Sequence, residues 1–181
     1  MIKINLEIED EVMEYTLPEN WDEVTVEQFV KIFSINREGL ALYEIATQTI
    51  NCFTDIKVEH LEMMDYKDYI KITELLKFTE KDVVPVTVEY VELNGEKYYL
   101  KTDFSQLTMG EVISIETLIG STDNFIKVMD KLLCVFLRKK KENGKLEIFK
   151  NNMMERDVMF RQLPVSQVIN IFSFFLDGVT S

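Results

Sequence analysis

Few side chains in this sequence have the types and spacing that metal or nucleophilic chemistry requires. The 181 residues include one histidine, His60, and two cysteines, Cys52 and Cys134. One imidazole and two widely separated thiols cannot supply the common zinc ligand sets. The acidic run EIEDE at residues 7–11 lacks the ligand spacing and the glycine of a calcium loop. We therefore expect no metal and no other cofactor, and we expect both cysteines to be small apolar groups buried at helix ends.

Phosphate binding and covalent catalysis have equally little support. The nearest match to a phosphate loop is LIGSTDN at residues 118–124, where Ser121 or Thr122 is better suited to cap a helix. The sequence contains no nucleophile elbow, serine–lysine pair or kinase motif. Its 32 acidic residues allow many carboxylate pairs, but no pair is distinguished by its position. We therefore predict that the protein is not an enzyme, and carboxylate-pair hydrolysis is the alternative.

Charge is distributed unevenly along the chain, which carries a net charge of −12. Residues 1–30 hold nine acidic residues and one lysine, whereas residues 84–181 hold thirteen acidic and twelve basic residues. This balance lacks the basic excess that phosphate backbones require, so direct nucleic-acid binding is not expected. No apolar run approaches the roughly 20 residues that cross a bilayer, and the acidic start is unlike a signal peptide. We expect a cytoplasmic product with no membrane association.

Two segments of opposite charge are the candidate contact sites, and we call them the acidic segment (residues 9–11) and the basic segment (residues 138–152). Their contact residues are predicted to be Glu9, Asp10 and Glu11 in the first and Lys139, Lys140 and Lys141 in the second. Both segments could be solvated loops that have no specific partner. Alternatively, the acidic segment of one copy meets the basic segment of another copy or of a different protein, and charge steers and aligns the association. Nine methionines and seven tyrosines could add an adaptable contact surface, although core filling accounts for most of them.

Hydrophobic periodicity predicts the elements of the first half of the chain. Residues 2–8 and 12–17 alternate apolar and polar side chains, which is typical of a half-buried hairpin. Thr25, with a glutamine three residues later, forms a capping box and predicts a helix start. Two further helices are expected over residues 39–51 and 65–78.

The second half repeats this order. Residues 86–91 and 96–101 are predicted strands, and the Asn-Gly pair at 94–95 between them is a strong hairpin signal because both residues accept a positive φ. Thr108, with a glutamate three residues later, forms a second capping box. Two further helices are expected, one from about residue 122 and one over residues 165–176.

An internal repeat links the two halves. The stretch YTLPENWDEVTVEQFVKI at residues 15–32 aligns without a gap with YYLKTDFSQLTMGEVISI at residues 98–115. The same helix-start pattern occurs at residues 21–32, 61–72, 104–115 and 160–171. Any capped amphipathic helix shows part of this pattern, but the hairpin that precedes each aligned stretch is more specific.

We therefore predict an α+β fold of two tandem related units, each a β-hairpin followed by about three helices. The units are residues 1–80 and residues 84–181, and the basic segment is an insert in the second unit. Units of this size bury a modest fraction of their surface, so we expect a shared interface or a continuous core. Trp21 and Phe104 occupy equivalent positions in the repeat and are predicted to pack onto the helix that follows.

The stretches LPENWDEVTVEQFVKI (residues 17–32) and LTMGEVISIE (residues 107–116) resemble segments of small acidic structural and assembly proteins of tailed bacteriophages, notably the crAss-like phages of gut Bacteroides. These proteins include tail-region, ring and cargo-type virion proteins and tail assembly chaperones. The resemblance implies a non-catalytic virion component near the head–tail junction or tail, present in the host cytoplasm during assembly. It implies other phage structural proteins or copies of the chain itself as partners, and no small-molecule substrate.

Two other functions remain open. A cytoplasmic tail assembly chaperone would hold an aggregation-prone partner and then leave, so it would be absent from purified particles. A host-directed effector would use the acidity of residues 1–30 to imitate nucleic acid and bind a basic host protein.

Overall fold

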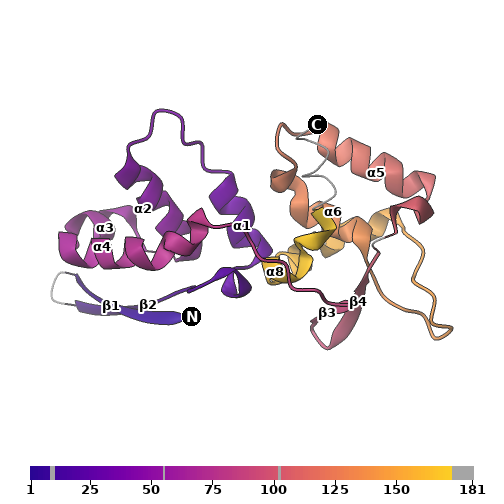
Figure 1. Cartoon of the computed structure of the whole chain (residues 1–181), viewed down its shortest axis with the longest axis horizontal. Helices are drawn as coiled ribbons and strands as arrows, with labels where there is room; N and C mark the ends of the chain where they lie inside the picture. Colours follow the sequence, from indigo (N-terminus) through magenta and orange to yellow (C-terminus); the bar gives the residue numbers. More distant parts are fainter. Residues whose placement is uncertain (9–10, 55, 102, 173–181) are drawn as a thin grey trace.

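A computed structural model describes residues 1–8, 11–54, 56–101 and 103–172. The fold is α+β, with many short helices and two small antiparallel sheets of strand order β1-β2 and β3-β4-β5. In Figure 1 the helices and hairpin of the first half form one lobe, and those of the second half form another beside it. Helices α1 and α8 lie where the two lobes meet.

The first lobe begins with a hairpin, as predicted. Its elements are β1 (Ile2–Ile8), β2 (Glu11–Leu17), η1 (Trp21–Glu23), α1 (Val26–Phe33), α2 (Leu42–Phe53), α3 (Val58–Met63), α4 (Tyr66–Leu75) and η2 (Leu76–Glu80). The strands pair from Ile2 opposite Leu17, and the alternation places Ile2, Ile4 and Tyr15 against the core. The predicted capping box is confirmed, because the Thr25 hydroxyl accepts from the Gln28 amide and the Gln28 side chain accepts from the Thr25 amide.

The second lobe also begins with a hairpin. Its elements are β3 (Tyr90–Leu93), β4 (Glu96–Leu100), η3 (Phe104–Gln106), α5 (Met109–Gly120), η4 (Phe125–Val128), α6 (Met129–Phe136), β5 (Leu137–Arg138), η5 (Asn151–Arg156), α7 (Asp157–Phe160) and α8 (Val165–Val168). Asn94 and Gly95 have φ angles of 53° and 75°, which confirms the predicted turn. The capping box of Thr108 and Glu111 is confirmed as well.

Several predicted boundaries are wrong where a tertiary contact or an alternative cap decides. Residues 86–89 are not part of a ladder, since the Val86 amide donates to the Ser166 carbonyl in another element. The helix expected from residue 122 begins at Phe125, because Asn124 and not Thr122 caps its first turn. Helix α2 begins three residues later than predicted, after a turn in which Gly39 has a φ of 77°. Helix α3 was not predicted, and the end of the predicted helix 165–176 lies outside the described residues.

One hydrophobic core runs through both lobes. Helix α6 lies at its centre, and its residues Leu132–Phe136 are completely buried. The lobes are also joined by backbone bonds at the starts of α1 and α8. The Val26 amide donates to the Leu163 carbonyl and the Val165 amide to the Val24 carbonyl, each at 2.9 Å. Two of the four predicted helix-start segments therefore pair with each other and fix the lobes together.

Candidate protein-interaction site

The acidic segment cannot be placed as a contact site. Glu9 and Asp10 lie outside the described residues, and Glu11 is the first residue of β2, where it pairs with Ile8 across the hairpin. The structure therefore places only Glu11 of this segment, at the start of β2, and the contact role of the three acidic residues stays a prediction.

The basic segment folds back on the second sheet. Lys139 and Lys140 form ion pairs with Glu96 at 3.2 Å and Glu89 at 3.1 Å. The Lys140 ammonium also lies 3.7 Å from the centre of the Tyr99 ring. The Lys141 side chain is exposed and has no ion-pair partner among the described residues, while its amide donates to the Lys145 carbonyl at 2.8 Å. Two of the three predicted contact lysines are thus partly neutralised within the chain.

Arg138 differs from its lysine neighbours because it is a buried residue. It is 1% exposed, and its guanidinium lies 3.2 Å from the Glu111 carboxylate, whose side chain is 2% exposed. Lys101 binds the same carboxylate at 2.8 and 3.0 Å, and the Thr108 amide donates to it at 2.7 Å. The Glu111 carboxylate therefore has two roles: it completes the capping box of α5 and it balances the buried charge of Arg138.

The electrostatics of this cluster keep both groups charged. Burial acts to raise the pKa of Glu111, but hydrogen bonds from Lys101 and Thr108 outweigh it and hold the pKa below its ordinary value. Burial lowers the pKa of Arg138, against the opposing effect of Glu111. The charged groups of the cluster are paired with one another, so the cluster ties the start of α5 to β5 and to Lys101.

A second ion pair holds the basic segment against η5. Arg156 binds the Glu147 carboxylate through both terminal nitrogens, and the same carboxylate accepts from the Lys139 amide at 3.1 Å. Although burial acts to raise it, the pKa of Glu147 is lowered by the hydrogen bonds from Arg156 and Lys139. The insert is therefore an ordered loop with fixed ends.

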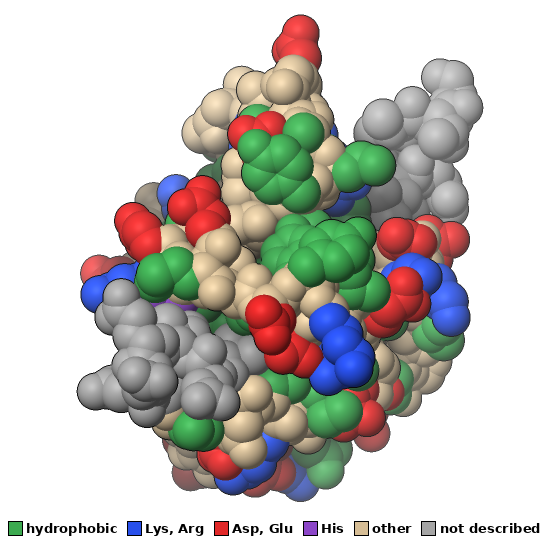
Figure 2. All heavy atoms as spheres, turned by 90° about the vertical axis from the view of Figure 1, so that its left-hand side faces the viewer, with side chains coloured by type: hydrophobic (Ala, Val, Ile, Leu, Met, Phe, Trp, Pro, Cys, Tyr) green, Lys and Arg blue, Asp and Glu red, His purple; other side chains and the backbone are tan. Residues whose placement is uncertain are grey.

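Another candidate site lies on the outer face of the first lobe. Helices α2, α3 and α4 enclose an open groove of about 380 Å³ that we call the tyrosine groove. Tyr43 from α2 and Tyr66 from α4 line it and are 65% and 77% exposed. Figure 2 shows apolar side chains gathered on this side of the molecule, among acidic and basic ones. The large exposed apolar side chains of these three helices are Leu42, Tyr43, Val58, Met63, Tyr66 and Ile70.

A third tyrosine fixes the shape of the tyrosine groove. The Tyr69 hydroxyl donates to the Tyr43 carbonyl at 3.0 Å and lies 3.3 Å from the Thr47 hydroxyl, so it ties α4 to α2. Leu61 from α3 is buried and also lines the groove. These contacts join α2, α3 and α4 within the chain itself, so the groove is formed without a partner in this structure.

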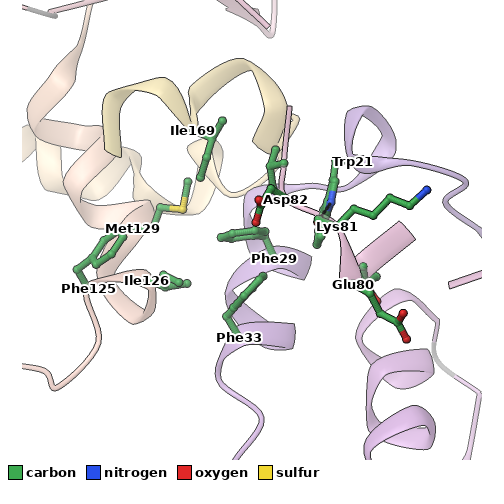
Figure 3. Close-up of a pocket in the computed structure, with 12 residues that line it drawn as sticks. Trp21, Phe29, Phe33, Glu80, Lys81, Asp82, Phe125, Ile126, Met129 and Ile169 are labelled. Atoms are coloured by element: carbon green, nitrogen blue, oxygen red, sulfur yellow. Dashed lines mark hydrogen bonds between the residues drawn. The ribbon is translucent and has the colours of Figure 1, made fainter. Parts of the chain in front are cut away.

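A separate apolar cavity of about 370 Å³ lies between the lobes (Figure 3). Phe29 and Phe33 of α1 face Met129 of α6 across it. Trp21 also lines the cavity, but its indole N–H donates to the Lys81 carbonyl at 2.8 Å. The rings therefore present mainly carbon to the cavity, and Glu80, Lys81 and Asp82 line it as well, so it suits an apolar group with a polar end.

Trp21 packs as predicted, edge-on to Phe29 with ring centres 5.5 Å apart. The side chain of its repeat counterpart, Phe104, lies outside the described side chains. Cys134 is buried in α6, where burial raises the pKa of its thiol to about 12, while Cys52 is only half-buried. A thiol with such a pKa is a poor nucleophile at neutral pH.

Among the described residues, no three His, Cys, Asp or Glu side chains lie close enough together to hold a metal ion. No helix in this part of the chain is both long enough and apolar enough to span a membrane. Comparison of the chain with protein-family models, curated proteins and solved structures found no match.

Sequence reasoning missed the tyrosine groove, although part of its signal was present. The abundance of tyrosine and methionine suggested that an adaptable surface could exist, and Tyr43 and Tyr66 are exposed in the groove. The predicted helix at residues 65–78 did not indicate that Tyr66, the first residue of α4, would be exposed. The missing information was α3, whose position defines the third wall.

Proposed function

We propose that the protein is a non-catalytic component of a tailed-phage particle that acts by binding other particle proteins. The tyrosine groove is the observation that supports the binding role. Contiguous exposed apolar side chains on a soluble protein commonly mark interaction sites, and large aromatic side chains are frequent interface anchors. The phage context is supported by the resemblance of residues 17–32 and 107–116.

The proposed organisation is two related units with a shared core. Both aligned stretches form the same local series: a hairpin, a short 3-10 helix and a helix whose first turn is closed by a capping box. The second unit differs in its third strand, β5, and in the ordered basic segment that follows.

Purified particles provide the direct test. Particles would be banded on a density gradient, and the chain quantified by mass spectrometry relative to a major tail protein. We expect a fixed copy number that survives a high-salt wash. Absence from washed particles would reject the virion role.

A tail assembly chaperone is the second candidate. The open tyrosine groove and the exposed Met63 of α3, one of the helices that form the groove, favour it, because flexible thioether side chains suit transient and varied partners. A chaperone would be recovered bound to a tail protein early in infection and would be missing from mature particles. The virion component is proposed to lie near the head–tail junction or tail, and the chaperone is proposed to act in the host cytoplasm.

A further inference from the structure

We propose that the tyrosine groove binds a basic amphipathic helix of a different protein, through apolar anchors of that helix flanked by lysine or arginine. This inference rests on the proposed binding role and names the chemistry of its partner.

The architecture of the groove favours a helix over an extended peptide. All three walls are helices, whose backbone N–H and C=O groups bond within each helix. An extended peptide gains affinity by adding to a free sheet edge, and the groove offers none among its described walls. A helix satisfies its own backbone, so it needs only apolar pockets, which Tyr43, Leu61 and Tyr66 provide.

The charge around the groove defines the sign of the partner. The described part of residues 42–70 contains five acidic residues and two basic ones. The acidic residues are Glu44, Glu59, Glu62, Asp65 and Asp68, and the basic ones are Lys57 and Lys67. Glu59, Glu62 and Asp65 are exposed and have no ion-pair partner within the part of the chain that the structure describes. Such carboxylates attract lysine and arginine that flank an apolar anchor.

A second copy of the chain is a poorer occupant than a different protein. Outside the groove, three described helices carry large exposed apolar side chains. These are α1 with Phe33, α5 with Met109 and Ile113, and α7 with Val158. Helix α1 carries one acid and one base, and α5 and α7 carry only acids. None of these helices presents the basic apolar face that the acidic groove would select.

The probe for the test is a synthetic 18-residue helix of leucine and lysine, with leucines spaced to form one face. Its scrambled sequence and a leucine–glutamate version are the peptide controls. Binding to the full chain would be measured by calorimetry or fluorescence anisotropy at low and high salt. We expect saturable one-to-one binding of the leucine–lysine helix, with the scrambled and glutamate peptides at least about tenfold weaker.

Protein variants localise the binding. Tyr43→Ala combined with Tyr66→Ala should weaken binding at least about tenfold, because two aromatic anchors are lost. Met109→Ala combined with Ile113→Ala is the matched control on α5, since these side chains are similarly exposed, at 70% and 55%. The control should change the affinity less than about twofold. Replacing Glu59 and Glu62 by glutamine should lower the affinity at low salt and flatten its salt dependence.

Three results would overturn the inference: equal binding of the scrambled peptide, equal binding of the glutamate peptide, or no effect of the two tyrosine substitutions. Dimerisation that is abolished by those substitutions would also overturn it, since the occupant would then be a second copy. These outcomes are independent of the particle test. If the chain is found in particles but does not bind the helix, the proposed function stands and this docking mode is rejected. If the chain binds the helix but is absent from particles, the docking mode stands and the virion role is rejected.

Discussion

Arg138 and Glu111 form a buried ion pair at 3.2 Å between the first residues after α6 and the first turn of α5. The pair joins two elements that are 27 residues apart in the sequence. Because Lys101 and Thr108 also contact the carboxylate, Glu111 has several partners, whereas Arg138 has one carboxylate and two backbone carbonyls. Its Nε atom is buried and has no partner among the described residues.

This asymmetry predicts unequal costs for the two sides of the pair. Glu111→Gln retains the cap but leaves the Arg138 charge buried without a counter-ion, and should lower the free energy of unfolding by about 3 kcal/mol. Arg138→Met leaves Glu111 paired with Lys101 and should cost about 1 kcal/mol. Urea unfolding of the full chain measures both.

The matched control lies in the other capping box. Gln28→Glu makes the reverse change at a position that forms no ion pair among the described residues. It should change the free energy of unfolding by less than about 0.5 kcal/mol. A greater cost for Arg138→Met than for Glu111→Gln would show that the buried pair is not organised around the carboxylate.

Stability should decrease in acid because of the same kind of pairing. The folded pKa values of Glu111 and Glu147 lie below the ordinary 4.5, so the unfolded chain binds more protons in acid. Their stabilisation is therefore complete above pH 4.5 and is lost as the pH falls through the folded pKa values. Unfolding free energies measured between about pH 3 and pH 7 should be flat at the upper end and fall below pH 4.5.

A double-mutant cycle assigns part of this decline to one pair. Glu147→Gln should make the acid slope shallower in the parent chain and should add little in an Arg156→Gln background, where its partner is gone. An unchanged slope in Glu147→Gln would remove this pair as a cause.

Local features were predictable from the sequence, because their causes lie within a few residues. The Thr25 and Thr108 capping boxes and the Asn94-Gly95 turn depend on side chains and φ preferences at neighbouring positions. The four-fold pattern also marks true helix starts, since α1, α4, α5 and α8 each begin one residue after its start position. A side-chain cap forms at Thr25 and Thr108 but not at Asp65 or Pro164, and Pro164 lies opposite Thr25.

Features decided by distant contacts were not predictable in this way. Arg138 belongs to the basic segment in sequence, yet its side chain is buried, because it pairs with the buried Glu111 carboxylate that caps α5. A strand was predicted over residues 86–91, but it begins only at Tyr90, and the Val86 amide donates to the carbonyl of Ser166 in α8. In both cases the deciding partner is separated by many residues, and periodicity carries no information about it.

Gly95 and Gly110 together test the hairpin turn, because both have room for a side chain but differ in backbone conformation. A Cβ at Gly95 or at Gly110 would meet no atom within 4 Å, but only Gly95 has a positive φ, of 75°. Gly95→Ala should therefore destabilise the chain by about 1–2 kcal/mol. Gly110→Ala, in the first turn of α5, should stabilise it by about 0.5 kcal/mol because the unfolded chain loses freedom. Thermal unfolding compares them, and equal shifts would contradict the assigned turn.

The oppositely charged segments predict that copies of the chain associate in a salt-sensitive way. The mass of the protein in solution at low and high salt is therefore the first quantity to measure. The ion pairs of Lys139 and Lys140 with Glu96 and Glu89 are partly exposed, so each contributes at most about 1 kcal/mol and can be exchanged for a partner's carboxylate. If the acidic segment of one copy meets the basic segment of another, the solution mass should be larger at low salt than at high salt. Light scattering after size exclusion measures it.

Replacing Lys139, Lys140 and Lys141 by serine should reduce that low-salt mass, and so should Glu9→Gln with Asp10→Asn and Glu11→Gln. The matched control replaces Lys67, Lys71 and Lys77 by serine, which removes the same charge and likewise breaks two surface pairs, with Asp68 and Glu74. A control that dissociates equally would indicate a net-charge effect rather than a contact. A monomer at both salts would exclude self-assembly through these segments. The proposed contacts would then be with other proteins, and the tyrosine groove would remain the proposed docking surface for them.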